Sequence, residues 1–154
     1  MEKSLSLFLV ILMFLSLTSC GTVYEDTNGP DDFTLQTITE DNIVNRNVGA
    51  SGLTYSETNL GGIVSSEYSS RNFNGVEQIY LTNLFGKSDV RVYIGHMSVE
   101  AGNFRLVAIN NDKIIKDFPL DAFGENYWFE DISGTFSIHV AGESAKFSFY
   151  IDIQ

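Results

Sequence analysis

The sequence predicts an all-β fold, an antiparallel β-sandwich of the jelly-roll or immunoglobulin-like type. From Ile63 onward, runs rich in β-branched and aromatic residues alternate with clusters of Gly, Asn, Asp and Ser at intervals of about ten residues, a rhythm typical of sandwiches and barrels. No segment has a convincing helical period of 3.6 residues. Aromatic residues make up 13% of the chain, so burial alone can supply a core.

The N-terminal segment is a short apolar run that ends at the single cysteine. Residues 5–17 are mostly apolar, too few to span a bilayer but enough for a signal-peptide core. The next residues, in the run Leu17-Thr18-Ser19-Cys20, resemble the lipobox of bacterial lipoproteins. The resemblance implies cleavage before Cys20 and lipidation of its thiol and new amino group. The alternative is an ordinary secretory signal that a cysteine happens to follow.

These observations divide the chain into three parts. We expect a lipoprotein signal peptide over residues 1–19, the lipidated cysteine and a flexible acidic tether over residues 20–32, and a single β-sandwich domain over residues 33–154. The protein is then extracytoplasmic and anchored to the cell membrane through its lipid. Because Gly21 stands where inner-membrane lipoproteins carry Asp, the outer membrane is a possible destination in a Gram-negative host.

Charge and cysteine content exclude several functions. The net charge of −11 at pH 7 repels phosphate backbones, so we expect no nucleic-acid partner. With its only cysteine lipidated, the mature chain has no thiol for a disulfide, a metal site or a nucleophile. No cofactor and no metal are expected. The sequence does not indicate an oligomeric state.

Two turns organise the expected strands. Asn74-Gly75 should form a turn between neighbouring strands, and Asn110-Asn111-Asp112 should form another, because these residues tolerate positive φ. Asp89–Val99 alternates so that Val90, Val92 and Ile94 share a face. A short helical turn can follow Pro119 over Leu120–Gly124. The strands expected before the C-terminal region are Phe33–Thr39, Leu53–Glu57, Ile63–Phe73, Val76–Leu84, Asp89–Val99, Asn103–Ile109 and Lys113–Phe118.

The C-terminal strands show the clearest alternation. Gly134–Ala141 and Ala145–Ile153 should each have one buried and one wet face, and Gly142-Glu143-Ser144 should close them into a hairpin. The run GTFSIHVAGESAKFSF resembles the C-terminal half of small secreted bacterial β-sandwich modules, which implies a fold and a location but no site. The residues expected in the core are Phe136, Ile138, Val140, Ala145, Phe147, Phe149, Ile151 and Ile153.

Candidate catalytic residues are sparse. His96 and His139 lie far apart without acids or cysteines at metal-ligand spacing, which argues against a zinc site. His139 shares its strand face with Thr135 and Ser137, so we expect it to be an exposed strand residue. No nucleophile elbow is present. Glu125, Glu130 and Asp131 cluster and could serve a glycosidase, but acids beside turns are common for solvation alone.

The candidate binding site is the run Tyr127-Trp128-Phe129 with the acids around it. Adjacent residues of a strand point to opposite faces, so one face displays an aromatic ring unless both faces are covered. Tyr127, Trp128, Glu125 and Glu130 are therefore possible ligand-binding residues, in the manner of sugar-binding modules. The expected function is a non-catalytic binding or structural module of the cell envelope with a protein or glycan partner. The alternatives are a carbohydrate-binding module that uses Trp128 and, less favoured, a small hydrolase.

Overall fold

The computed structural model of the protein describes residues 35–154. The expected signal peptide, Cys20 and tether lie outside the described residues. The fold is all-β and antiparallel, as the sequence predicts, with one short helix, α2 (Glu40–Asn45). Within residues 35–154, no helix is long and apolar enough to cross a membrane. The strands are β1 (Thr54–Leu60), β2 (Ile63–Asn110), β3 (Lys113–Asp117) and β4 (Phe123–Ile153).

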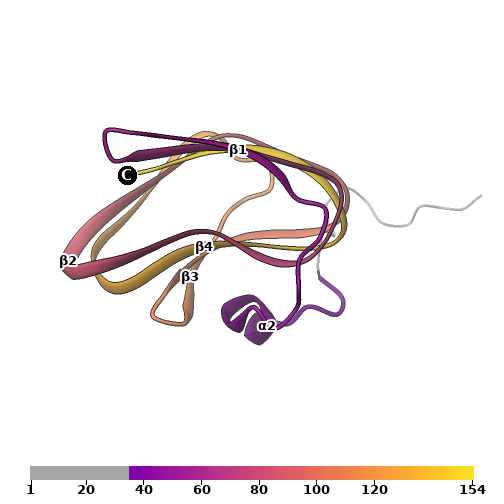
Figure 1. Cartoon of the computed structure of the whole chain (residues 1–154), viewed down its shortest axis with the longest axis horizontal. Helices are drawn as coiled ribbons and strands as arrows, with labels where there is room; N and C mark the ends of the chain where they lie inside the picture. The colour runs from indigo at the N-terminus through magenta and orange to yellow at the C-terminus, as the bar shows by residue number, and fades with distance from the viewer. Residues whose placement is uncertain (1–34) are drawn as a thin grey trace, which may run out of the picture.

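The long strands β2 and β4 form a ribbon that turns back over itself (Figure 1). Val64 pairs with Ile153 at one end of the ribbon, and the pairing continues to His96 and Phe123 at the other. The later part of β2 then returns along the opposite edge of β4, where Val92 also pairs with Ile153. The C-terminal part of β4 therefore has β2 on both sides and is the centre of the sheet.

Asn74-Gly75 is a bend inside β2, and the predicted turn between two strands is wrong. The register shifts on both sides of Phe73, and the chain continues in the same strand. Gly75 has a φ of 105°, and a Cβ at this position would collide with the carbonyl oxygen of Gly49. The backbones of Ser51 and Asn74 bond each other at 2.9 and 3.2 Å. The glycine thus allows the segment before β1 to cross β2 closely.

The predicted C-terminal hairpin is also wrong. Gly142-Glu143-Ser144 is an irregularity within β4, where Ser144 has a φ of 52°. The residues on either side of it do not pair with each other; they pair with β2, as in Phe73 with Ala145. Alternation in the sequence identifies which residues share a face, but it does not identify the partner strand.

Other local predictions have mixed outcomes. The turn at Asn111 and Asp112 is confirmed, with φ values of 47° and 60°, and it joins β2 to β3. The predicted strand at Leu53–Glu57 is confirmed except for Leu53, since β1 begins at Thr54. The described residues 35–39 of the expected first strand are not in a strand. The segment after Pro119 is a turn, in which the amide of Ala122 donates to the carbonyl oxygen of Pro119 at 3.2 Å.

The main hydrophobic core lies inside the rolled sheet. Phe104 packs its ring 4.3 Å from that of Phe147, centroid to centroid, so strands β2 and β4 meet there. The predicted inward faces of both C-terminal segments and of Asp89–Val99 are confirmed. All of these residues are buried in one cluster: Val90, Val92, Ile94, Phe136, Ile138, Val140, Ala145, Phe147, Phe149, Ile151 and Ile153.

Helix α2 covers a second apolar cluster on the outside of the sheet. Thr39 caps the helix, its hydroxyl accepting a bond from the amide of Asn42 while the Asn42 side chain bonds the Thr39 amide. Ile43 points into the sheet and is fully buried. Because α2 packs here, β4 is buried on both faces around His139, and the prediction of one wet face is wrong at this place. The cluster contains Ile38, Ile43, Val76, Val107, Ile109 and Ala141.

Candidate functional site

Trp128 is exposed on the outer face of β4. Its side chain is 60% accessible, whereas the neighbouring Tyr127 and Phe129 are half-buried against the core. The ring of Tyr127 meets that of Phe118 edge-on at 5.0 Å. Strand alternation therefore separates the three aromatic residues, and Trp128 alone faces solvent.

The sheet places polar side chains beside Trp128. Arg91 is its register partner on β2, and the backbone of Arg91 exchanges bonds of 2.8 and 3.0 Å with Gln154 at the C-terminus. Two residues further along β2, Tyr93 pairs with both Asn126 and Asp152. Residues from three separate stretches of the chain thus share one outer face of the sheet.

Two tyrosine rings extend this face. Gly95 lies under them, since a Cβ at Gly95 would approach Tyr150 Cδ1 at 2.7 Å and Tyr93 Cε1 at 3.3 Å. The missing side chain lets both rings lie close to the backbone. A hydrogen bond to Asp152 is the main cause that raises the pKa of Tyr150. We call Arg91, Tyr93, Trp128, Tyr150 and Asp152 the aromatic face.

Of the other predicted ligand-binding residues, Tyr127 and Glu125 lie on the side of β4 opposite to Trp128. Tyr127 turns inward, and its hydroxyl donates to Glu125, while Lys116 holds its ammonium 5.0 Å from the ring centroid. Burial, together with the Glu125 carboxylate, raises the pKa of Tyr127. Glu130 is exposed two residues after Trp128 and lies on the same side of the strand. Of the four predicted residues, Trp128 and Glu130 therefore share a face, and Tyr127 and Glu125 share the opposite one.

Two of the three acids considered for glycoside hydrolysis have separate partners. Glu125 accepts the hydroxyl of Tyr127, and Asp131 forms an ion pair with Lys87 at 3.5 Å. Among residues 35–154, no group of three or more His, Cys, Asp or Glu side chains could hold a metal ion.

His139 is buried, and the prediction of an exposed strand residue is wrong. Its accessibility is 2% because α2 lies over it, and its Nδ1 is 2.8 Å from the carbonyl oxygen of Ile43. Burial lowers the pKa of His139, the bond to Ile43 opposes this, and the charge of Arg46 lowers it further. Nδ1 is the donor in the neutral ring, so His139 attaches the helix to the sheet.

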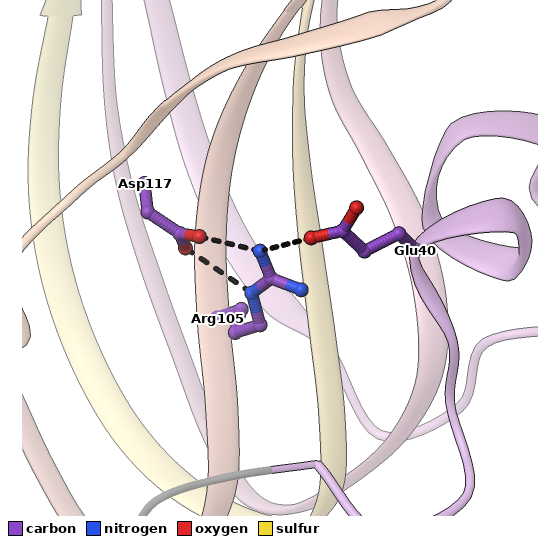
Figure 2. A network of polar contacts seen from close by, with 3 residues as sticks. All are labelled: Glu40, Arg105 and Asp117. Carbon is purple, nitrogen blue, oxygen red and sulfur yellow. Dashed lines mark hydrogen bonds and ion pairs between the residues drawn. The ribbon is translucent and has the colours of Figure 1, made fainter.

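Two polar contacts hold the segment around α2 in place. Arg105 on β2 pairs with Asp117 of β3 on one side and with Glu40 of α2, at 3.6 Å, on the other (Figure 2). The carboxylate of Glu143 accepts bonds from the amides of residues 36, 37 and 38 at 2.7, 2.6 and 2.9 Å. Burial would raise the pKa of Glu143, but these bonds lower it to about 2.

Comparison with known proteins does not assign the aromatic face. No protein-family model matches the sequence, and no curated protein matches it. Sequence reasoning placed Arg91 and Tyr93 opposite a buried face, and Tyr150 and Asp152 on the wet face of the last strand. It missed that these residues lie beside Trp128, because only the register between β2 and β4 brings them together.

Proposed function

We propose that the protein is an extracytoplasmic lipoprotein, anchored through Cys20, whose β domain is a non-catalytic binding module of the cell envelope. The aromatic face is the observation that carries the proposal. An exposed tryptophan beside an arginine, two tyrosines and a carboxylate is an arrangement suited to recognition, because aromatic residues and arginine dominate binding surfaces. The lipobox at residues 17–20 supports the location.

The exposed Trp128 favours a glycan as the ligand. The apolar face of a sugar ring packs on an indole, while sugar hydroxyls need donors and acceptors around it. Arg91 supplies donors, Asp152 supplies acceptors and Asn126 supplies both.

A protein partner is the second candidate, favoured by β1. This strand pairs with β2 along one edge only, among the described residues, and all seven of its residues are exposed. A partner strand could extend the sheet there. The separate engagement of Glu125 and Asp131 gives a hydrolase no comparable support.

We also propose that the rolled sheet is a β-sandwich of the jelly-roll type. In a jelly roll, a long antiparallel ribbon folds over so that its two halves pack face to face. The continuous pairing of β2 with β4, and the second pairing of β2 along the other edge of β4, support this topology over an immunoglobulin-like one.

Affinity electrophoresis of the purified domain in gels that contain soluble envelope polysaccharides tests the glycan proposal. The parent protein should be retarded by at least one polysaccharide, and Trp128→Ala should lose most of the retardation, since stacked aromatics contribute strongly to such contacts. Phe123→Ala is the matched control, because Phe123 is another exposed aromatic of β4 outside the aromatic face. Equal losses in both variants would contradict the proposal.

Mass spectrometry of the membrane-extracted protein tests the anchor. We expect an N-terminal peptide that begins at Cys20 and carries a diacylglycerol thioether. Cys20→Ala should release the chain from the membrane fraction, since stable anchoring needs the acyl chains. A free thiol at Cys20 in the membrane-bound protein would refute lipidation.

A further inference from the structure

A pocket of about 400 Å³ lies beside β1 and the segment of residues 50–53 that precedes it. Tyr55 and Glu57 of β1 line one side, and Glu77, Gln78 and Ile79 of β2 line the other. The remaining lining residues are neutral, so two carboxylates face the pocket without any Lys, Arg or His. None of these residues belongs to the aromatic face.

The aromatic wall of the pocket is held firmly by the core. Tyr55 stacks on Tyr68, its register partner, with ring centroids 5.7 Å apart, and Tyr68 stacks on Phe149 at 5.1 Å. The Tyr68 hydroxyl donates to the carbonyl oxygen of Ile79 at 3.3 Å, which joins the two sides of the pocket. One face of the Tyr55 ring is thus covered, and the residue is still 63% exposed. Its other face is available to a ligand.

The pocket has a negative electrostatic potential. Burial is the main cause that raises the pKa of the Tyr68 hydroxyl, and the charge of Glu57 raises it further, so the Glu57 carboxylate acts on the pocket wall. The net charge of −11 adds to the local attraction for cations. A recess concentrates this field more than a flat surface does.

We propose that this pocket binds a small organic cation, a primary or quaternary ammonium group, independently of the aromatic face. The ammonium lies against the open face of Tyr55 as a cation–π contact. The carboxylates of Glu57 and Glu77 neutralise its charge from the two sides of the pocket. An anionic ligand is repelled, and a neutral one gains only the ring contact.

Calorimetric titration of the purified chain with choline chloride tests this site, with 3,3-dimethylbutan-1-ol as a neutral compound of the same shape. We expect saturable binding of choline, at least about tenfold tighter than that of the alcohol, and weaker binding at higher salt. Glu57→Gln and Glu77→Gln should each weaken choline binding by about five- to tenfold. Tyr55→Leu should weaken it by about two- to fivefold.

Two control variants separate this site from other effects. Glu67→Gln removes the same charge from an exposed position on the other face of β2, and Trp128→Ala removes the ring of the aromatic face. Both should bind choline like the parent, and urea melts should show that every variant is folded. The inference fails if choline does not saturate, if the neutral alcohol binds equally well, or if Glu67→Gln loses as much affinity as Glu57→Gln. Loss of glycan binding in Trp128→Ala with choline binding intact distinguishes the two sites.

Discussion

Glu143 is the residue that fastens the segment before α2 to the sheet. Its carboxylate accepts three backbone amides, and it also bonds the hydroxyl of Thr37 and the side chain of Asn103. We expect Glu143→Gln to lower the free energy of unfolding at pH 7 by about 1–2 kcal/mol, since the charge that strengthens these bonds is lost and solvent screens part of it. Urea melts measure this, and Glu130→Gln, an exposed change on the same strand, should stay within about 0.5 kcal/mol.

The free energy of unfolding that Glu143→Gln loses should become smaller as the pH falls. The pKa of Glu143 is about 2 in the folded protein against an ordinary 4.5. A lowered carboxyl pKa stabilises the fold above the ordinary value, and this contribution disappears as the pH falls toward 2. The difference between Glu143→Gln and the parent should therefore shrink between pH 5 and pH 2. A difference that stays constant over this interval would show that the charge is not what holds the segment.

Single residues were predictable from the sequence only where their neighbours in the chain decide their environment. The inward residues of Asp89–Val99 follow from alternation, and the structure confirms them. Glu143 looked like a turn residue because the backbone amides that it accepts lie more than 100 positions away. His139 shares a strand face with Thr135 and Ser137, so alternation indicated exposure, and only the docking of α2 buries it.

At the scale of elements, α2 is held by packing more than by its own sequence. A helix of six residues is too short to be stable alone, and Ile43 supplies its fully buried contact with the sheet. We expect Ile43→Ala to cost about 2–4 kcal/mol through lost burial and a cavity. Urea melts measure this, and Val44→Ala, at a partly buried position of the same helix, should cost less.

The pKa of His139 provides a second measurement of how α2 packs on the sheet. Its lowered pKa depends on the cover that α2 provides, so NMR titration should show the pKa moving up toward 6.5 in Ile43→Ala if the helix loosens. An unchanged His139 titration together with a large loss of stability would mean that Ile43 supports the sheet without fixing the helix over it.

The sequence predicted which residues of a strand face the core better than it predicted which strands pair with each other. Composition and alternation predicted the strands, and the turn at Asn111 and Asp112 was confirmed because its conformation is a local property. Asn74-Gly75 and Gly142-Glu143-Ser144 carry the same turn chemistry, but they form bends within long strands. A glycine that relieves a close backbone approach and one that closes a hairpin look alike in the sequence, so pairing over long distances could not be inferred.

For the whole molecule, the C-terminal part of β4 decides stability, because it pairs with β2 on both sides and fills the core. Phe149 is fully buried, and its ring packs with those of Tyr68, Phe104 and Phe147. Phe149→Ala should lower the free energy of unfolding by about 3–5 kcal/mol, a large share of the ~5–15 kcal/mol of an ordinary domain. Ser148→Ala, on the opposite face of the same strand, should change it by less than ~0.5 kcal/mol. Urea melts of both variants measure these differences, and a serine variant as unstable as the phenylalanine variant would show that the register of β4 is shifted by one residue.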